Sequence, residues 1–265
     1  MRLELMNATQ AILAEVENKS GKKIRYMEKN DLSISAQFRL AGRQSSEHML
    51  LYKADHGRLI NYIIANQCGH ILRILDAPED KRFFPIANKK TMMCYMMETE
   101  DEINRLKAVF GDKIKQMITM WYQGVVFQLT KMPPDIQIDK WIYDTYHELR
   151  PIQMKSIHYQ LQNAIQGLSE DLKKIVPFKV YNVSNIMNYA FFKILENHFH
   201  LDFVRPYHRT IFLFDGSALA RITEQGYRNN HEGDVSMINR WADKLEIKNW
   251  FEWKHIDDMP ADYIY

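Results

Sequence analysis

Several features that define whole classes of protein are missing from this chain of 265 residues. Its two cysteines, Cys68 and Cys94, cannot build the disulfide framework of a small secreted protein, so we expect both to be reduced. No apolar run approaches the ~20 residues that a membrane-spanning helix needs. The segment Met1 to Leu5 also lacks the basic and then apolar order of a secretion signal. These absences predict a cytoplasmic protein without a membrane partner.

An excess of one charge is missing as well. The chain has 35 basic and 33 acidic residues, a formal net charge of +2, so it carries no electrostatic footprint for sequence-independent binding of nucleic acid. It contains no repeat of solenoid length and no low-complexity tract. With 46% hydrophobic and 26% charged residues, it has the composition of a folded globular protein with one large core or two smaller ones.

The N-terminal part of the chain alternates between helical and strand patterns. Apolar residues recur at helical spacing over residues 3–17 and alternate as in strands over 22–27, 32–40 and 48–53. Turn-forming residues separate these segments. We therefore expect a helix, three short strands and then a second helix, which Pro78 ends.

The second helix contains the sequence Asn66-Gln67-Cys68-Gly69-His70, which has the frame of the zinc-peptidase motif H-E-x-x-H. In the intact motif, two His residues on one helix face bind zinc and the Glu activates the bound water. Here Asn66 replaces the first His and Gln67 replaces the Glu, so that only His70 remains. The amide of Asn66 is a poor zinc ligand, and Gln67 cannot take a proton from water. The motif predicts weak or vestigial zinc binding and no ordinary peptide hydrolysis.

A second segment, Glu100 to Leu106, opens a predicted helix downstream. It resembles the E-x-x-A-N-x-F pattern of the ImmA/IrrE family of zinc metallopeptidases, whose first Glu can supply the third metal ligand and whose Asn helps to order the site. Carried over by position, Glu100 is that carboxylate and Asn104 is the supporting amide. Ile103 and Leu106 stand where the family usually has Ala and an aromatic residue, so the match is partial.

The resemblance covers about the first half of the chain and implies an α+β fold. It places a zincin-like unit in residues 1–132 and a mostly helical part in 133–265, with Pro133-Pro134 as the break. In zincins, the last strand before the motif helix is typically the edge that pairs with a peptide substrate. The resemblance also implies an ImmA/IrrE-like homologue that has lost standard catalysis, binds a peptide or protein partner and belongs to a stress-response, phage or mobile-element setting.

Two other interpretations remain open. One is an active zinc peptidase or hydrolase that uses His70, Glu100 and a replacement ligand such as Glu98 or His56. The other is a helical adaptor protein without a metal site, which predicts that His70 and Glu100 lie far apart. Two substitutions in one motif, at Asn66 and Gln67, favour natural divergence over an engineered change.

The remaining pattern is mostly helical. An irregular connection is expected over 79–94 and a strand over 210–216, which pairs with 218–223 as a hairpin. The aromatic run 249–253 is interpreted as closing a core. Helices are expected over 98–109, 112–131, 136–149, 152–167, 183–199 and 234–245.

Three further groups of residues have structural interpretations. Met92, Met93, Met96 and Met97 are expected to fill a core rather than line a peptide groove. Cys68 and His70 are two residues apart on a helix and do not form a nucleophile pair. The histidines near the end of the 183–199 helix are expected to stabilise that helix end and not to bind a metal.

Overall fold

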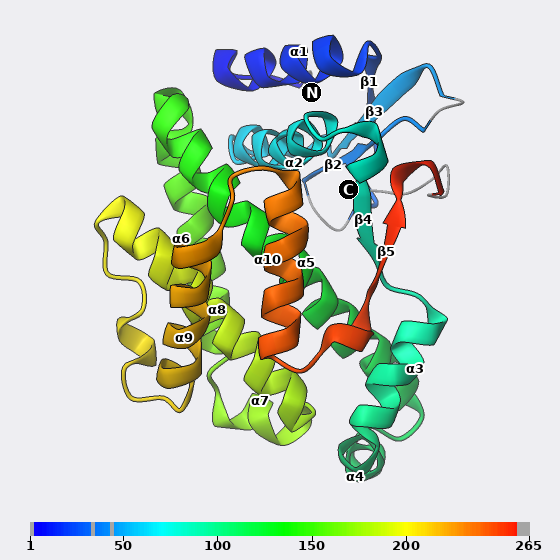
Figure 1. Cartoon of the computed structure of the whole chain (residues 1–265), viewed down its shortest axis with the longest axis vertical. Coiled ribbons are helices and arrows are strands. Elements are labelled where there is room, and N and C mark those ends of the chain that lie inside the picture. Colours follow the sequence, from blue (N-terminus) through cyan, green and yellow to red (C-terminus); the bar gives the residue numbers. More distant parts are fainter. Residues whose placement is uncertain (1–2, 33–34, 43–44, 259–265) are drawn as a thin grey trace.

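The structure is a computed structural model that describes residues 3–32, 35–42 and 45–258. The fold is mixed α+β, with a small sheet near the N-terminus and a largely helical remainder (Figure 1). The expected N-terminal order of helix, three strands and helix is confirmed. These elements are α1 (Asn7–Ser20), β1 (Lys23–Glu28), β2 (Ala36–Arg39), β3 (Glu47–Tyr52) and α2 (Ile60–Leu75).

The three strands form a sheet in the order β1-β3-β2. The central strand β3 runs parallel to β1 and antiparallel to β2, and its Leu50 lies opposite Tyr26 on one side and Phe38 on the other. The strand immediately before α2 is therefore enclosed by two neighbours. The expectation that this strand is a free edge for a peptide is wrong, because the chain returns to place β3 between the two earlier strands.

The second part of the chain is built mainly from helices. They are α3 (Lys89–Glu98), α4 (Glu100–Phe110), α5 (Ile114–Thr145), α6 (Arg150–Gln166), α7 (Glu170–Ile175), α8 (Phe178–Phe199), α9 (Phe212–Gly226) and α10 (His231–Lys244). Two short strands, β4 (Phe83–Ile86) and β5 (Glu252–His255), pair antiparallel and join distant parts of the sequence. No helix of the described ranges is long and apolar enough to cross a membrane.

Two expected segments have a different structure. Residues 79–94 contain β4 and the start of α3, where the side chain of Asn88 accepts a hydrogen bond from the Thr91 N–H and so caps the helix. Of the expected strand over 210–216, residues 212–216 form the start of α9, and the expected partner strand over 218–223 lies in the same helix. The buried residues of α9 recur at helical spacing, and the apolar run that resembles a strand is only its first turn.

The helix α5 is continuous through Pro133 and Pro134, so the expected break there is wrong. Neither proline can donate a backbone hydrogen bond, which normally disfavours a helix interior. Both prolines are buried, and α5 packs along its length against other elements. Tertiary packing thus outweighs the local preference, and the helices expected over 112–131 and 136–149 are one.

The buried apolar side chains of the described residues form two groups. The larger lies among the helices of the second half and includes Trp241 and Trp250, so the interpretation of the C-terminal aromatic run as core is confirmed. The smaller lies among α1, α2, the sheet and the end of α5, from which it takes Ile138 and Ile142. The predicted boundary between residues 132 and 133 falls inside α5, which contributes to both cores.

Candidate functional site

Polar residues of the motif helix α2 face α5 in a row of which Tyr62 and His70 are buried and Asn66 is half-buried. Tyr62, Asn66 and His70 are each four residues apart and therefore lie on one face of α2. Gly69 beside them allows the two helices to approach, since a Cβ atom there would lie 2.6 Å from Cγ2 of Ile138. The approach places the polar face of α2 directly against α5.

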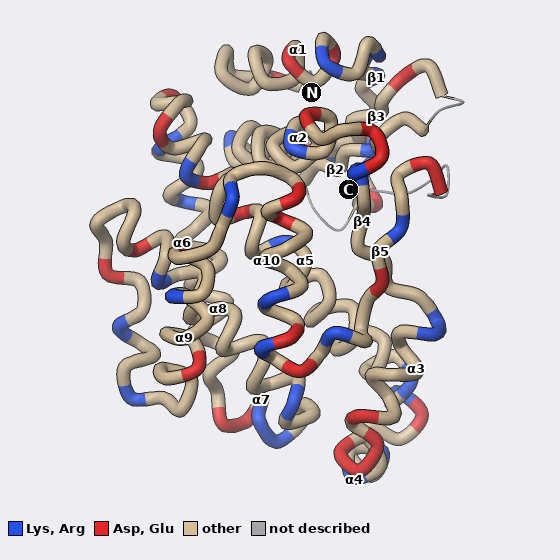
Figure 2. The backbone as a smooth tube through the Cα atoms, in the orientation of Figure 1, with Lys and Arg blue, Asp and Glu red and all other residues tan. Residues whose placement is uncertain are grey.

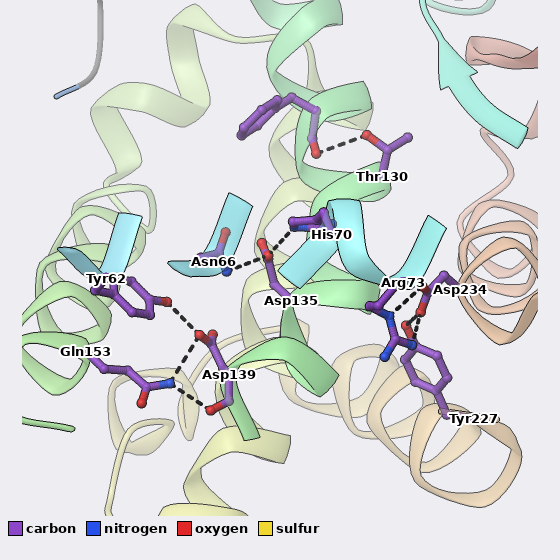
Figure 3. A network of polar contacts seen from close by, with 11 residues as sticks. Tyr62, Asn66, His70, Arg73, Thr130, Asp135, Asp139, Gln153, Tyr227 and Asp234 are labelled. Atoms are coloured by element: carbon purple, nitrogen blue, oxygen red, sulfur yellow. Dashed lines mark hydrogen bonds and ion pairs between the residues drawn. The ribbon is translucent and has the colours of Figure 1, made fainter. Parts of the chain in front are cut away.

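The opposing helix supplies Lys131, Asp135 and Asp139 with the same spacing of four residues. Oδ1 of Asp135 accepts a hydrogen bond from Nδ2 of Asn66 at 3.0 Å and lies 2.7 Å from Nε2 of His70. The hydroxyl of Tyr62 donates to Oδ1 of Asp139 at 2.6 Å (Figure 3). We call these six residues of α2 and α5 the polar seam.

Neighbouring helices extend this network. Nε2 of Gln153 on α6 donates to the backbone oxygen of Asp139 at 2.7 Å. At the other end, Arg73 of α2 forms an ion pair of 2.6 Å with Asp234 of α10, and the Tyr227 hydroxyl donates to the same carboxylate (Figure 3). The face of α2 is therefore connected through side chains to three helices.

The two partners at the centre of the polar seam differ in charge. Burial, followed by the nearby charge of Lys131, lowers the pKa of His70 to about 4, so the ring is neutral near pH 7 and its Nε2–H donates to Asp135. Burial opposes ionisation of Asp135, but His70, Lys131 and Asn66 outweigh it and hold the pKa of this carboxyl below its usual value. The centre of the seam is thus an ionised carboxylate held by two neutral donors.

Burial is the largest cause of the pKa shifts of Asp139 and Lys131, which lie on either side of Asp135 along α5. Burial raises the pKa of Asp139 to about 8, with a further contribution from the charge of Asp135. This carboxyl is therefore mainly protonated at neutral pH. Burial lowers the pKa of Lys131 to about 7, although Asp135 favours its charged form. The two acids of α5 therefore hold one negative charge between them near neutral pH.

Gln67 points away from the polar seam toward the sheet. Its Nε2 donates to the backbone oxygen of Ala36 on β2 at 2.9 Å. Its Oε1 is buried and has no hydrogen-bond partner among the described residues. The residue at the motif's general-base position therefore connects α2 to β2.

The structure does not bring the predicted residues of α4 to this site. Glu100 is exposed at the start of α4, which lies at the opposite end of the molecule from α2 (Figure 1). Oδ1 of Asn104 accepts a hydrogen bond from Lys107 of the same helix. Thus the carboxylate beside His70 is Asp135, and Glu100 lies far from His70 (Figure 1), as the interpretation of the chain as a helical adaptor predicts.

The proposed replacement ligands also have other neighbours. Glu98 accepts hydrogen bonds from Lys179 and from the indole of Trp250. The ring of His56 packs edge-on against Tyr52 before α2 begins. Glu98 and His56 are therefore each engaged in contacts that do not involve His70.

The sequence contains a signal for Asp135 that the predicted helix break concealed. The run from Asp135 to Trp141 has an acid first, Asp139 four residues later and an aromatic residue two positions beyond that. This is the spacing of the pattern that we assigned to Glu100. Pro133-Pro134 indicated a break directly before this run, whereas the structure places the run within α5.

The donor set of the polar seam does not fit a catalytic zinc ion. The described residues contain no group of three or more His, Cys, Asp or Glu side chains that could hold a metal ion. His70 and Asp135 are two suitable ligands, but Asn66 turns its N–H toward the carboxylate, and an N–H group cannot coordinate a cation. In this arrangement at most two side chains of the polar seam, His70 and Asp135, can act as zinc ligands.

A second pair with catalytic residue types lies at the end of α1. Nε2 of His48 is 2.8 Å from Oγ of Ser20, beside a cavity of about 310 Å³. However, Nδ1 of His48 accepts the N–H of Ala41, so the ring proton is on Nε2 and points to the serine. His48 cannot accept a proton from Ser20 in this arrangement. The pair connects α1 to the sheet and does not form an activated nucleophile.

The other reactive side chains also have structural surroundings. Cys68 is fully buried in the smaller core, and burial raises the pKa of its thiol far above the usual value, which keeps it unreactive. His198 lies 3.1 Å from Asp144 near the end of α8. His200 ends that helix in the left-handed conformation, with φ of 56°.

Comparisons with protein-family models, with curated proteins and with solved structures found no match to this chain. The function is therefore inferred from the site itself.

Proposed function

We propose that the chain is a non-hydrolytic relative of the ImmA/IrrE-type zinc peptidases that acts by binding a peptide or protein partner. The observation that carries this proposal is the direct hydrogen bonding of Asp135 to His70 and Asn66, at 2.7 and 3.0 Å. In a zinc site each ligand atom lies about 2 Å from the ion, which separates the ligand atoms from one another. Here the three side chains satisfy one another directly.

The arrangement of elements supports the relationship to zinc peptidases. A sheet precedes the helix with the altered motif, and the acid that meets His70 comes from a later helix with the family's spacing of acid, polar residue and aromatic residue. Asp135, Asp139 and Trp141 occupy those three positions. The likeness thus extends to a contact between the two motifs.

The chemistry of the substituted residues supports loss of hydrolysis. Gln67 has no titratable group and donates to β2, and Asn66 offers an N–H where a metal ligand is needed. The His70 ring is neutral, and its Nε2–H donates a hydrogen bond to Asp135. None of these three groups is placed to activate a water molecule.

A partner that adds a strand to the sheet has a place beside this site. Among the described residues, β2 pairs only with β3, so its outer edge offers backbone donors and acceptors to an extended peptide, except for the Ala36 oxygen that accepts from Gln67. Gln67 contacts this strand at Ala36. A peptide bound along β2 would therefore lie near the altered motif without meeting a catalytic group.

The first test is to restore the motif. The double substitution Asn66→His with Gln67→Glu gives two His ligands on α2, with Asp135 as the third. We expect it to bind about one zinc ion per chain, while the unaltered protein retains little zinc after purification without affinity nickel. Adding Asp135→Asn or His70→Ala to the restored protein should remove the metal, whereas adding Glu100→Ala should not.

Two results would contradict the proposal. Stoichiometric zinc in the unaltered protein, together with peptide hydrolysis that a chelator abolishes, would identify an active enzyme. A restored variant that remains folded by circular dichroism but binds no zinc would remove the support for peptidase ancestry.

A further inference from the structure

Three methionines of α3 are exposed on one face of that helix. The exposed fractions of Met93, Met96 and Met97 are 54%, 37% and 75%. Their spacing of three and four residues places them together. Of the four methionines expected to fill a core, only Met92 packs against one, so that expectation is wrong for the other three. We call Met93, Met96 and Met97 the Met face.

The helix that presents the Met face is firmly held. Tyr95, on the opposite side of α3, stacks on Tyr122 of α5 and meets Trp250 edge-on. Glu98 at the end of the helix accepts hydrogen bonds from Lys179 and Trp250. These contacts account for the buried side of α3, and nothing in them requires three large apolar side chains on the exposed side.

Acidic side chains follow directly after the Met face. Glu100, Asp101 and Glu102 occupy the first turn of α4, and Figure 2 shows acidic residues gathered on that helix. Within the described part of the chain, these three acids form no ion pair. Acids in a first turn stabilise a helix through its dipole, which explains their position but not the exposed methionines beside them.

We propose that the Met face and the first turn of α4 bind a basic amphipathic helix of a protein partner. Unbranched, polarizable methionine side chains adapt to different apolar ligands and are common on peptide-binding surfaces. Leucine-type residues of the partner would cover the Met face, while its lysines and arginines would approach Glu100 and Asp101. An anionic membrane surface is disfavoured because these acids would repel it.

This proposal rests on the proposed function in one respect, namely that the chain acts by binding a partner. It does not depend on the zinc-peptidase ancestry. The metal content of the restored Asn66→His and Gln67→Glu variant tests that ancestry at the other end of the molecule. The two proposals can therefore fail separately.

The test measures binding of the full chain to a fluorescent synthetic peptide of about 20 residues, with leucine at helical spacing and lysine elsewhere. We expect saturable binding that weakens as salt is added, because exposed charges are screened. Replacing both Met93 and Met97 by Ser should weaken binding about tenfold or more. Replacing Glu100 and Asp101 by Lys should weaken it about as much and remove most of the salt dependence.

The matched control is Phe214→Ser on α9, which removes an apolar side chain that is 80% exposed at another place. This variant should keep the affinity of the unaltered protein, and all variants should keep its circular dichroism spectrum and melting temperature.

Three results would overturn the inference. The first is absence of saturable binding, and the second is equal affinity for a version of the peptide with glutamate in place of lysine. The third is a change in the sedimentation of the chain alone when Met93 and Met97 are replaced, which would identify a second copy as the occupant of the Met face.

Discussion

Two helix pairs of this molecule approach closely by different means. The polar seam between α2 and α5 places the half-buried carboxylate of Asp135 against the buried ring of His70 and the amide of Asn66, and it pairs Tyr62 with Asp139. The contact between α8 and α9 instead packs Tyr181 against Phe212 and brings Tyr189 against Gly216. Both pairs use a glycine for close approach, but only the first also contains a buried histidine and a buried aspartate, His70 and Asp139.

This difference shows that two helices of this chain can pack closely without a polar seam. Burying charged groups costs free energy unless each is paired, and apolar side chains of similar size often stabilise a protein as well or better. The α8–α9 pair demonstrates that this chain can pack helices in that way. The polar seam is a property of this helix pair in particular, in line with the ancestry proposed above, and four substitutions compare the two pairs.

The largest effect is expected from Asp135→Ala in the polar seam. This change removes the acceptor that His70 and Asn66 share, and it removes the negative charge of Asp135 near Lys131. We expect a loss of about 3 kcal/mol in the free energy of unfolding, measured by denaturant titration. Asp135→Asn, which keeps an acceptor oxygen, should lose less. A loss below about 1 kcal/mol for the alanine variant would show that the seam contributes little.

The next effect is expected from Gly216→Ala in the apolar pair. An added Cβ would lie 2.5 Å from Cδ1 of Tyr189 and 2.8 Å from its Cβ, so the aromatic side chain cannot simply rotate away. We expect a loss of about 2 kcal/mol by the same titration. The control is Gly124→Ala on α5, where an added Cβ meets nothing within 4 Å. That variant should gain up to about 1 kcal/mol from helix propensity.

A smaller loss is expected from Gly69→Ala in the polar seam. The new Cβ would lie 2.6 Å from Cγ2 of Ile138, a single branch methyl that can shift. We expect a loss of about 1–2 kcal/mol in thermal or chemical unfolding. Combining the change with Ile138→Leu, which removes the branch, should recover part of the loss. No recovery would indicate that the contact with Trp141 limits the approach.

The smallest effect at neutral pH is expected from Asp139→Asn. Because the folded-state pKa is raised to about 8, the folded chain binds this proton more tightly than the unfolded chain does. The contribution of Asp139 to stability is therefore full below pH ~4 and is lost as the pH rises toward 8. The asparagine variant should not show this decline. The difference in melting temperature between the variant and the unaltered protein should therefore shift in favour of the variant as the pH rises from ~4 toward 8. Parallel profiles would contradict the raised pKa.

Local periodicity predicted the N-terminal elements well. The alternation around β1 to β3 and the helical repeat of α2 reflect one buried face for each element, which is a property that sequence alone displays. The same rules failed for α9, where a short apolar run has strand-like composition, and for α5, where two prolines are tolerated because both are buried in a packed helix. Each failure reflects tertiary contacts that override a local preference.

The candidate site could be predicted only in part. Asn66, Gln67 and His70 were correctly placed on one helix because helix spacing is local. The carboxylate that contacts His70 was not predicted correctly. Both Glu100 and Asp135 begin a run with the same short spacing pattern, and only the fold determines which of them lies against α2. The direction of Gln67 toward β2 likewise depends on the strand order of the sheet.

The length of α5 has a consequence for how the chain folds. Its 32 residues form a rod of about 48 Å that gives side chains to both cores. A fragment that ends at residue 132 would lose Ile138, Ile142 and Leu149 from the smaller core. We therefore expect neither half to fold when expressed alone, and the intact chain to melt in a single cooperative calorimetric transition.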